Sequence, residues 1–77
     1  MTIQELQSLR DSGQFHHATY RERGSIWEGL YIYAKAVDGF RGYKLAGCFN
    51  RDSSPDLQAA EAIVRGTGVS VDSYGKG

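Results

Sequence analysis

The segment from Ile26 to Val37 constrains the fold of this chain more than any other part of the sequence. It is rich in Ile, Trp, Tyr and Val, the residue types that favour β-strands. Because successive strand side chains point to opposite faces, the segment has one aliphatic face, with Leu30 and Ile32, and one aromatic face. The aliphatic face suits the covered side of a sheet, beneath helices, which leaves the aromatic face uncovered. The aromatic face contains Trp27, Tyr31, Tyr33, Lys35 and Val37.

Helices are predicted at both ends of the chain. Thr2 and Glu5 match a capping box, in which each side chain satisfies a free backbone N–H, and apolar residues then recur at helical spacing as far as Ser12. The second helix starts in the segment 53–56, where a serine can cap, a proline takes the first turn and an aspartate favours the positive end of the helix dipole. It ends at one of the two glycines that follow Arg65.

Three strands are predicted between the helices, and a short strand follows the second helix. Apart from the segment already described, they are Phe15–Arg23, Tyr43–Asn50 and Val69–Tyr74, with a tight turn at Gly24-Ser25 and a second turn at Asp38–Gly42. The order α-β-β-β-α with a terminal β predicts an α+β fold. We expect an antiparallel-dominated sheet of three or four strands with both helices packed on one face. Residues 1–77 are expected to form one small domain, with 75–77 as a frayed tail.

The α-β-β-β-α order resembles that of the double-stranded-RNA-binding domains. The resemblance is one of topology and covers the element order alone. The second helix of that family begins with a pair of lysines, whereas Pro55 and Asp56 stand at that point here. Without those lysines the resemblance does not imply RNA binding for this chain, and the residues assign no family.

The predicted register places aromatic and basic side chains together on the uncovered face. Ala18 and Tyr20 suit the covered side of the first strand, and Tyr43, Leu45 and Phe49 suit the covered side of the third. A shift of one residue in any strand would exchange its two faces. With this register, the candidate binding residues are Trp27, Tyr31, Tyr33, Arg21, Arg23, Lys35, Lys44 and His17.

A face of this composition is typical of molecular recognition. Tyr, Trp and Arg dominate the energetic centres of protein interfaces, so we expect a non-enzymatic interaction module that binds a protein partner or a second copy of itself. The rings would supply buried area, and the cations would orient the partner. Nucleic-acid binding through the same face is the alternative, since rings stack on bases and cations pair with phosphates. A small accessory protein with no ligand of its own is the second alternative.

The charge balance ranks these alternatives. Nine Lys and Arg residues accompany nine Asp and Glu residues, which gives a formal net charge of zero. Proteins that bind nucleic acids usually carry an excess of Lys and Arg, because phosphate contacts supply most of their affinity. Neutrality therefore places a protein partner ahead of nucleic acid.

The sequence has no recognisable catalytic, cofactor or metal constellation. His16 and His17 are adjacent, and adjacent residues of a regular strand point to opposite faces, so we expect them not to share a metal ion. Cys48 and His17 are expected on the two outer strands. A strand spacing of ~4.8 Å then separates them by about 9–10 Å, too far for a nucleophile and its base. The prediction is a protein that is not an enzyme and has no cofactor and no metal.

The expected compartment is the cytoplasm. Cys48 is the only cysteine, so no disulfide can form within the chain, and a secreted domain of this size would normally need such cross-links. The segment from Met1 to Gln14 is polar and has a helical pattern, unlike a signal peptide. No apolar run approaches the ~20 residues of a membrane span, so no membrane partner is expected.

Overall fold

The computed structural model describes residues 1–36, 42–69 and 71, and it contains two helices and three strands. These elements are α1 (Ile3–Asp11), β1 (Phe15–Arg21), β2 (Gly29–Lys35), β3 (Tyr43–Asn50) and α2 (Ser54–Gly66). The strands form one antiparallel sheet in the order β1-β2-β3. The predicted α+β class and the antiparallel three-stranded sheet are therefore confirmed. In the predicted last strand, Val69 and Val71 belong to no helix or strand, and positions 70 and 72–74 lie outside the described residues.

The start of α1 confirms the predicted capping box. The hydroxyl of Thr2 accepts a hydrogen bond from the N–H of Glu5 at 3.1 Å, and the carboxylate of Glu5 accepts one from the N–H of Thr2 at 2.8 Å. Gly13 follows the helix with a φ of 76°, a left-handed conformation that glycine adopts without steric cost. At the second helix Ser53 is the N-cap residue, but its side chain makes no capping hydrogen bond.

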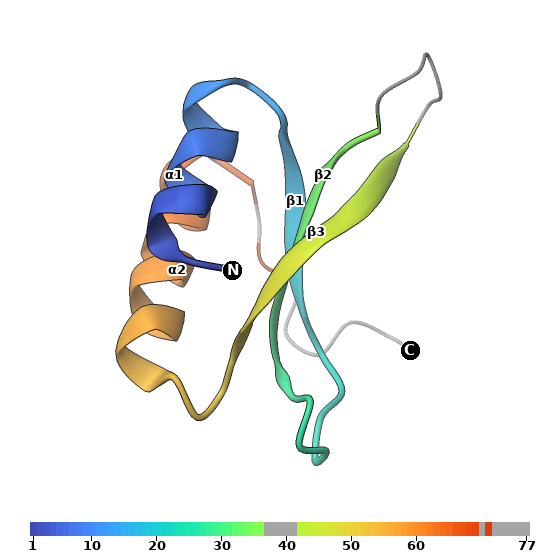
Figure 1. The fold of residues 1–77 in the computed structure, drawn as a ribbon, viewed down its shortest axis with the longest axis vertical. Helices are drawn as coiled ribbons and strands as arrows, with labels where there is room; N and C mark the ends of the chain where they lie inside the picture. The colour runs from blue at the N-terminus through green and yellow to red at the C-terminus, as the bar shows by residue number, and fades with distance from the viewer. Residues whose placement is uncertain (37–41, 70, 72–77) are drawn as a thin grey trace.

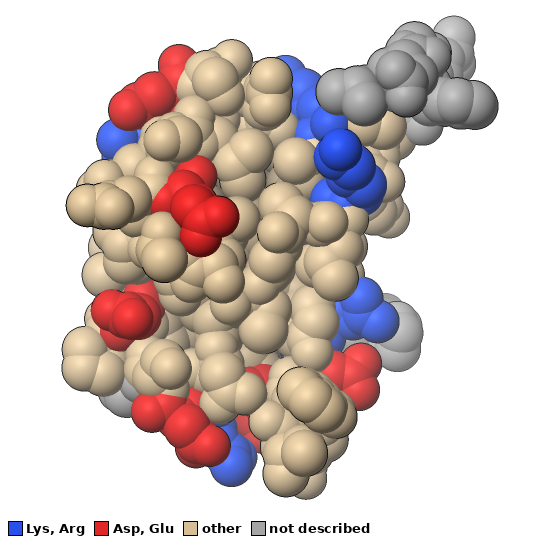
Figure 2. Space-filling model, viewed as in Figure 1, with Lys and Arg blue, Asp and Glu red and all other residues tan. Residues whose placement is uncertain are grey.

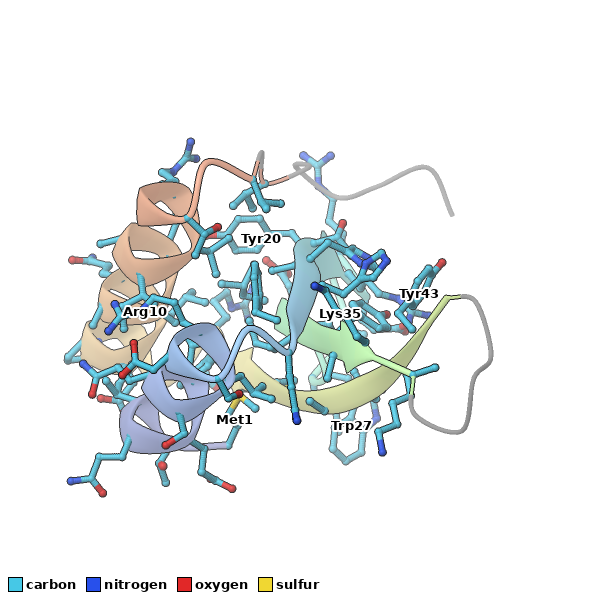
Figure 3. All side chains as sticks on the ribbon, turned by 90° about the horizontal axis from the view of Figure 1, so that it is seen from above. Met1, Arg10, Tyr20, Trp27, Lys35 and Tyr43 are labelled. Atoms are coloured by element: carbon cyan, nitrogen blue, oxygen red, sulfur yellow. The ribbon has the colours of Figure 1, made fainter. Side chains whose placement is uncertain are left out.

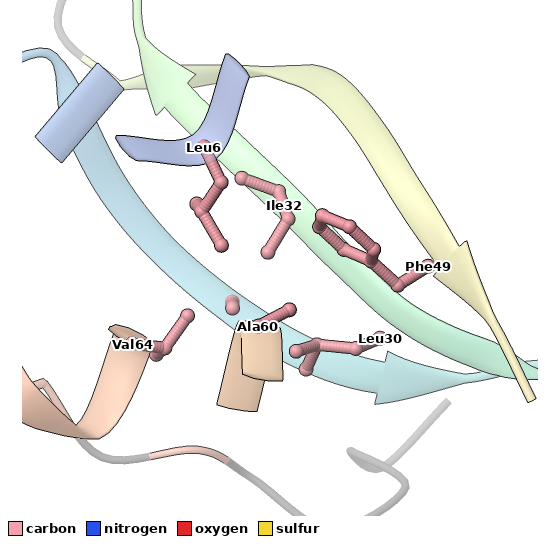
Figure 4. Packing of buried hydrophobic residues seen from close by; sticks show 7 residues of the cluster. Leu6, Leu30, Ile32, Phe49, Ala60 and Val64 are labelled. Atoms are coloured by element: carbon pink, nitrogen blue, oxygen red, sulfur yellow. The ribbon is translucent and has the colours of Figure 1, made fainter. Parts of the chain in front are cut away.

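Both helices lie on the same side of the sheet (Figure 1). The core between the helices and the sheet is small and aliphatic, with Phe49 as its one ring, and Figure 4 shows its seven residues. It consists of Leu6 from α1, Ala60 and Val64 from α2, and Ala18, Leu30, Ile32 and Phe49 from the three strands. Burial of each large side chain contributes roughly 1.5–3 kcal/mol relative to leaving it exposed, so this cluster holds the helices on the sheet.

Two β-bulges set the register of the sheet. In β1 the pairing shifts between Phe15, which lies opposite Ala34, and His17, which lies opposite Tyr33. One extra residue, His16, therefore stands in β1. In β3 the pairing shifts at Ala46, in the same way. Each bulge exchanges the faces of the residues beyond it.

The bulge in β3 overturns part of the predicted register. Tyr43 and Leu45 lie opposite Lys35 and Tyr33, and therefore face away from the helices rather than towards them. Lys44 lies opposite Ala34, so the prediction that Lys44 shares the uncovered face is wrong. The physical reason is the one extra residue at position 46, which reverses the alternation in the first half of the strand.

The connection between β1 and β2 is wider than the predicted tight turn. We call residues 22–28 the hairpin loop. β1 ends at Arg21, and Glu22 takes a left-handed φ of 61°, which breaks the strand before Arg23. Inside the loop the carboxylate of Glu28 accepts a hydrogen bond from the N–H of Gly24 at 2.9 Å and pairs with Arg51 at 3.1 Å. The predicted extension of the central strand to Ile26 is therefore wrong, because a buried carboxylate folds that segment into a loop.

Candidate binding face

The face of the sheet turned away from the helices is the candidate site, and we call it the open face. By register it carries side chains from all three strands, at alternate positions interrupted by the two bulges. Its residues are His17, Thr19, Arg21, Tyr31, Tyr33, Lys35, Tyr43, Leu45, Cys48 and Asn50. Figure 3 shows Tyr43 and Trp27 on this side, with the helices on the other.

Four aromatic and imidazole rings form a packed cluster on the open face. His17 stacks on Tyr33 with an interplanar angle of 6° and a centroid distance of 4.6 Å. Tyr43 meets His17 edge to face at 4.5 Å and Tyr33 at 5.4 Å, and it also contacts His16 at 4.9 Å. We call these four residues the ring cluster. Edge-to-face and offset pairs at such distances are favourable, each by about 0.5–1.5 kcal/mol beyond area burial.

The bulge in β1 brings both histidines into this cluster. Their rings are 4.9 Å apart, and a hydrogen bond of 2.8 Å joins the two Nδ1 atoms. The prediction that His16 and His17 point to opposite faces is therefore wrong. A regular strand would separate them, but the extra residue of the bulge leaves His16 out of the alternation.

Arg21 is the best-anchored cation of the open face. Its guanidinium donates a hydrogen bond to the hydroxyl of Tyr33 and lies 5.3 Å from the centroid of the Tyr31 ring. Its other terminal nitrogen lies 3.7 Å from the carboxylate of Glu22. The hydrogen bond with Tyr33 is the main cause that raises the pKa of Arg21 above its ordinary value. Arg21 is thus held in one orientation by the hydroxyl of Tyr33 and the ring of Tyr31.

The hairpin loop is fastened to one end of the open face by two side chains. The hydroxyl of Tyr31 donates to the carbonyl of Trp27 at 2.8 Å, and the amide of Asn50 donates to the carbonyl of Ile26 at 2.9 Å. The side chains of Ile26 and Trp27 remain free of the core, at 78 % and 65 % exposure. Burial is the main cause that raises the pKa of Tyr31, followed by the nearby Cys48.

Charge is distributed unevenly between the two sides of the molecule. The three strands contain Arg21, Lys35 and Lys44 and no carboxylate. Figure 2 shows acidic side chains mainly over the helices, whereas basic ones lie beside the sheet. Of the strand cations, Arg21 and Lys35 belong to the open face and Lys44 does not.

Most of the predicted site residues do come together, but three of them need correction. His17, Arg21, Tyr31, Tyr33 and Lys35 share the open face, as predicted. Trp27 adjoins it from the hairpin loop instead of from a strand, while Arg23 lies in that loop and Lys44 lies on the other face.

Sequence reasoning missed three open-face contributors, namely His16, Tyr43 and Leu45. In both strands, one feature of the sequence indicates the bulge that changes which residues reach the open face. Gly47 stands inside a strand, where glycine often marks a bulge. In β1 the apolar residues Phe15 and Ala18 are three positions apart and both pack with the core, which a strict alternation of two does not allow.

Three other features would bear on function, namely a metal centre, a reactive thiol and a membrane-spanning helix. Among them no group of three or more His, Cys, Asp or Glu side chains is arranged to hold a metal ion. The thiol of Cys48 is free and half-buried. Cys48 lies opposite Tyr31 in β2, whereas His17 lies opposite Tyr33 from the other outer strand. None of the described helices is long and apolar enough to span a membrane.

The described residues form a three-stranded antiparallel sheet with two helices on one side and an aromatic face that neither helix covers. Comparisons of this chain with protein-family models, curated proteins and solved structures find no match. A function must therefore be inferred from the chain's own residues.

Proposed function

We propose that this protein is a non-enzymatic interaction module whose open face binds a protein surface. One observation supports this proposal above all. Among the described residues, the large hydrophobic side chains that remain exposed are Ile26, Trp27, Tyr43 and Leu45, and each belongs to the open face or to the hairpin loop fastened to it. Scattered exposed apolar residues need no explanation, but a group gathered at one face is typical of an interaction site.

The geometry of the face also suits a protein partner energetically. The ring cluster and the guanidinium of Arg21 are already packed against one another, so little side-chain entropy would be lost when a partner covers them. Rigid rings and an anchored arginine are the residue types that carry most of the free energy in protein interfaces. Trp27 and Leu45 would supply the apolar area around them.

The distribution of cations favours this function over nucleic-acid binding. Of the four basic residues expected on the face, Arg21 and Lys35 remain on it, and Arg21 is close to the carboxylate of Glu22. A nucleic-acid surface needs several cations that are available to phosphates. Two cations among exposed hydrophobic side chains are better suited to orienting a protein partner.

A second copy of the chain is the first partner to test. A chain of this length buries only about 60 % of its unfolded surface when it folds, so association offers a substantial gain in burial. Light scattering over a range of concentrations measures the mass of the wild type and of Leu45→Lys, which places a charge at an exposed apolar position of β3 on the open face. Gln58→Lys is the matched control, because it adds the same charge at an exposed position of α2.

We expect a dimer for the wild type and for Gln58→Lys, and a monomer for Leu45→Lys. Monomers for all three proteins would contradict self-association. An oligonucleotide titration at several salt concentrations then tests the remaining alternative. Binding that weakens steeply with salt, and that is lost in Arg21→Gln, would contradict the proposal in favour of nucleic acid.

A further inference from the structure

The bulge in β1 creates a pair of nitrogen donors within the ring cluster, whose rings, but not whose nitrogen atoms, enter the proposed protein-binding function. His16 and His17 share one side of the sheet, and their Nδ1 atoms are 2.8 Å apart. Imidazole nitrogen is a preferred ligand of zinc, copper and nickel ions. We infer that this histidine pair is a binding site for a divalent transition-metal ion of the Cu²⁺ or Ni²⁺ class.

The number of available donors indicates the class of ion. Among the described residues, no third His, Cys, Asp or Glu side chain is arranged to complete a metal site with the two imidazoles. A structural Zn²⁺ site takes four protein ligands in a tetrahedron, whereas Cu²⁺ and Ni²⁺ favour square-planar or tetragonal sets of nitrogen and oxygen donors. Two imidazole nitrogens completed by water oxygens therefore suit Cu²⁺ or Ni²⁺, and the hydrogen bond of 2.8 Å already brings both nitrogens within reach of one ion.

Neighbouring rings hold both imidazoles in place for such an ion. His17 stacks on Tyr33 and meets the edge of Tyr43, and His16 also contacts Tyr43. Ligands that are already oriented lose less conformational entropy when the ion binds. Tyr33 is buried, with 8 % exposure, so its ring is a fixed support for His17.

Metal binding would replace the hydrogen bond between the two rings. In that bond one Nδ1 carries the proton and the other accepts it, whereas each Nδ1 must present a lone pair to the metal ion. The proton therefore moves to Nε2 of the same ring, so that both histidines are neutral with protonated Nε2 atoms. The two histidines supply two ligands, and water fills the remaining coordination positions.

Titration of the full chain with Cu²⁺, in a buffer that does not bind metals, tests this site. We expect saturable binding of one Cu²⁺ per chain, with an electron paramagnetic resonance spectrum of a tetragonal ion with two nitrogen ligands. Because Cu²⁺ is the tightest-binding ion at most sites, the spectrum and not the affinity tests the geometry.

Two variants assign the binding to this pair. His16→Gln removes the exposed ligand and leaves the stacked His17 in place, and it should abolish saturable binding while circular dichroism shows an intact fold. Cys48→Ser is the matched control, since it removes the one thiol of the described residues and should bind Cu²⁺ as the wild type does. No saturable binding by the wild type, unchanged binding by His16→Gln, or a loss in Cys48→Ser would each overturn the inference.

Discussion

The imidazole of His17 lies parallel to the phenol ring of Tyr33, at 6° and 4.6 Å between centroids, although the two residues come from different strands. The hydroxyl of the same tyrosine accepts a hydrogen bond from Arg21. Tyr33 is therefore the residue that joins the ring cluster to the guanidinium at the other end of the open face. Its position in the middle strand allows it to contact residues of both neighbours.

Removal of the Tyr33 hydroxyl tests how firmly this face is organised. Tyr33→Phe keeps the ring stack and deletes the acceptor of Arg21, so we expect the free energy of unfolding to fall by about 0.5–1.5 kcal/mol. Urea denaturation followed by the fluorescence of Trp27 measures the change. In a double-mutant cycle with Arg21→Gln, the two effects should be less than additive. Full additivity would show that the hydrogen bond contributes nothing to stability.

Gly29 is expected to be the glycine least tolerant of substitution in the described chain. A Cβ built at this position would lie 2.2 Å from the carbonyl oxygen of Phe49, a backbone atom of the paired strand. Gly29→Ala must therefore push β2 away from β3, and we expect a loss of about 1–3 kcal/mol or more in thermal or urea unfolding.

Gly66→Ala serves as the control for that substitution. Gly66 is the last residue of α2, and a Cβ there would meet no atom within 4 Å. The change to alanine should be neutral or stabilising, by up to about 1 kcal/mol, because alanine favours the helix. Equal losses for Gly29→Ala and Gly66→Ala would contradict the close approach of the two strands.

Glu61 should make the stability of the protein depend on pH in the acid range. Its carboxylate accepts hydrogen bonds from the hydroxyl of Tyr20 and from Arg65, the latter at 2.9 Å. These two bonds, with that of Tyr20 the larger, lower the pKa of Glu61 below its ordinary 4.5. A carboxyl whose pKa is lower in the folded state stabilises the fold above its ordinary pKa, and this contribution is lost as pH falls through the lowered value.

The corresponding measurement compares the wild type with Glu61→Gln. The difference in unfolding free energy should be largest above pH 4.5 and should shrink as the pH falls below that value. Glu22→Gln, a carboxylate of the hairpin loop with a long 3.7 Å ion pair, controls for the change in net charge. A difference that does not vary with pH would show that the carboxylate of Glu61 is not stabilised by the fold.

Local patterns in the sequence predict the helices, the strands and most of the core. The capping box of Thr2 and Glu5, the stop at Gly13 and the helical spacing of Ala60 and Val64 are local patterns. Each depends on residues that are three or four positions apart, so the chain specifies them before it folds. The alternation in Leu30 and Ile32 likewise identified the covered face of the middle strand.

The pairing of the strands, by contrast, fixes which side chains of the outer strands share the open face. The bulges at His16 and Ala46 are defined by how β1 and β3 pair with β2, and each reverses the faces of the residues beyond it. The buried carboxylate of Glu28 likewise pairs with Arg51, the residue that follows β3. Register and loop width depend on contacts between segments distant in sequence, and local patterns do not contain that information.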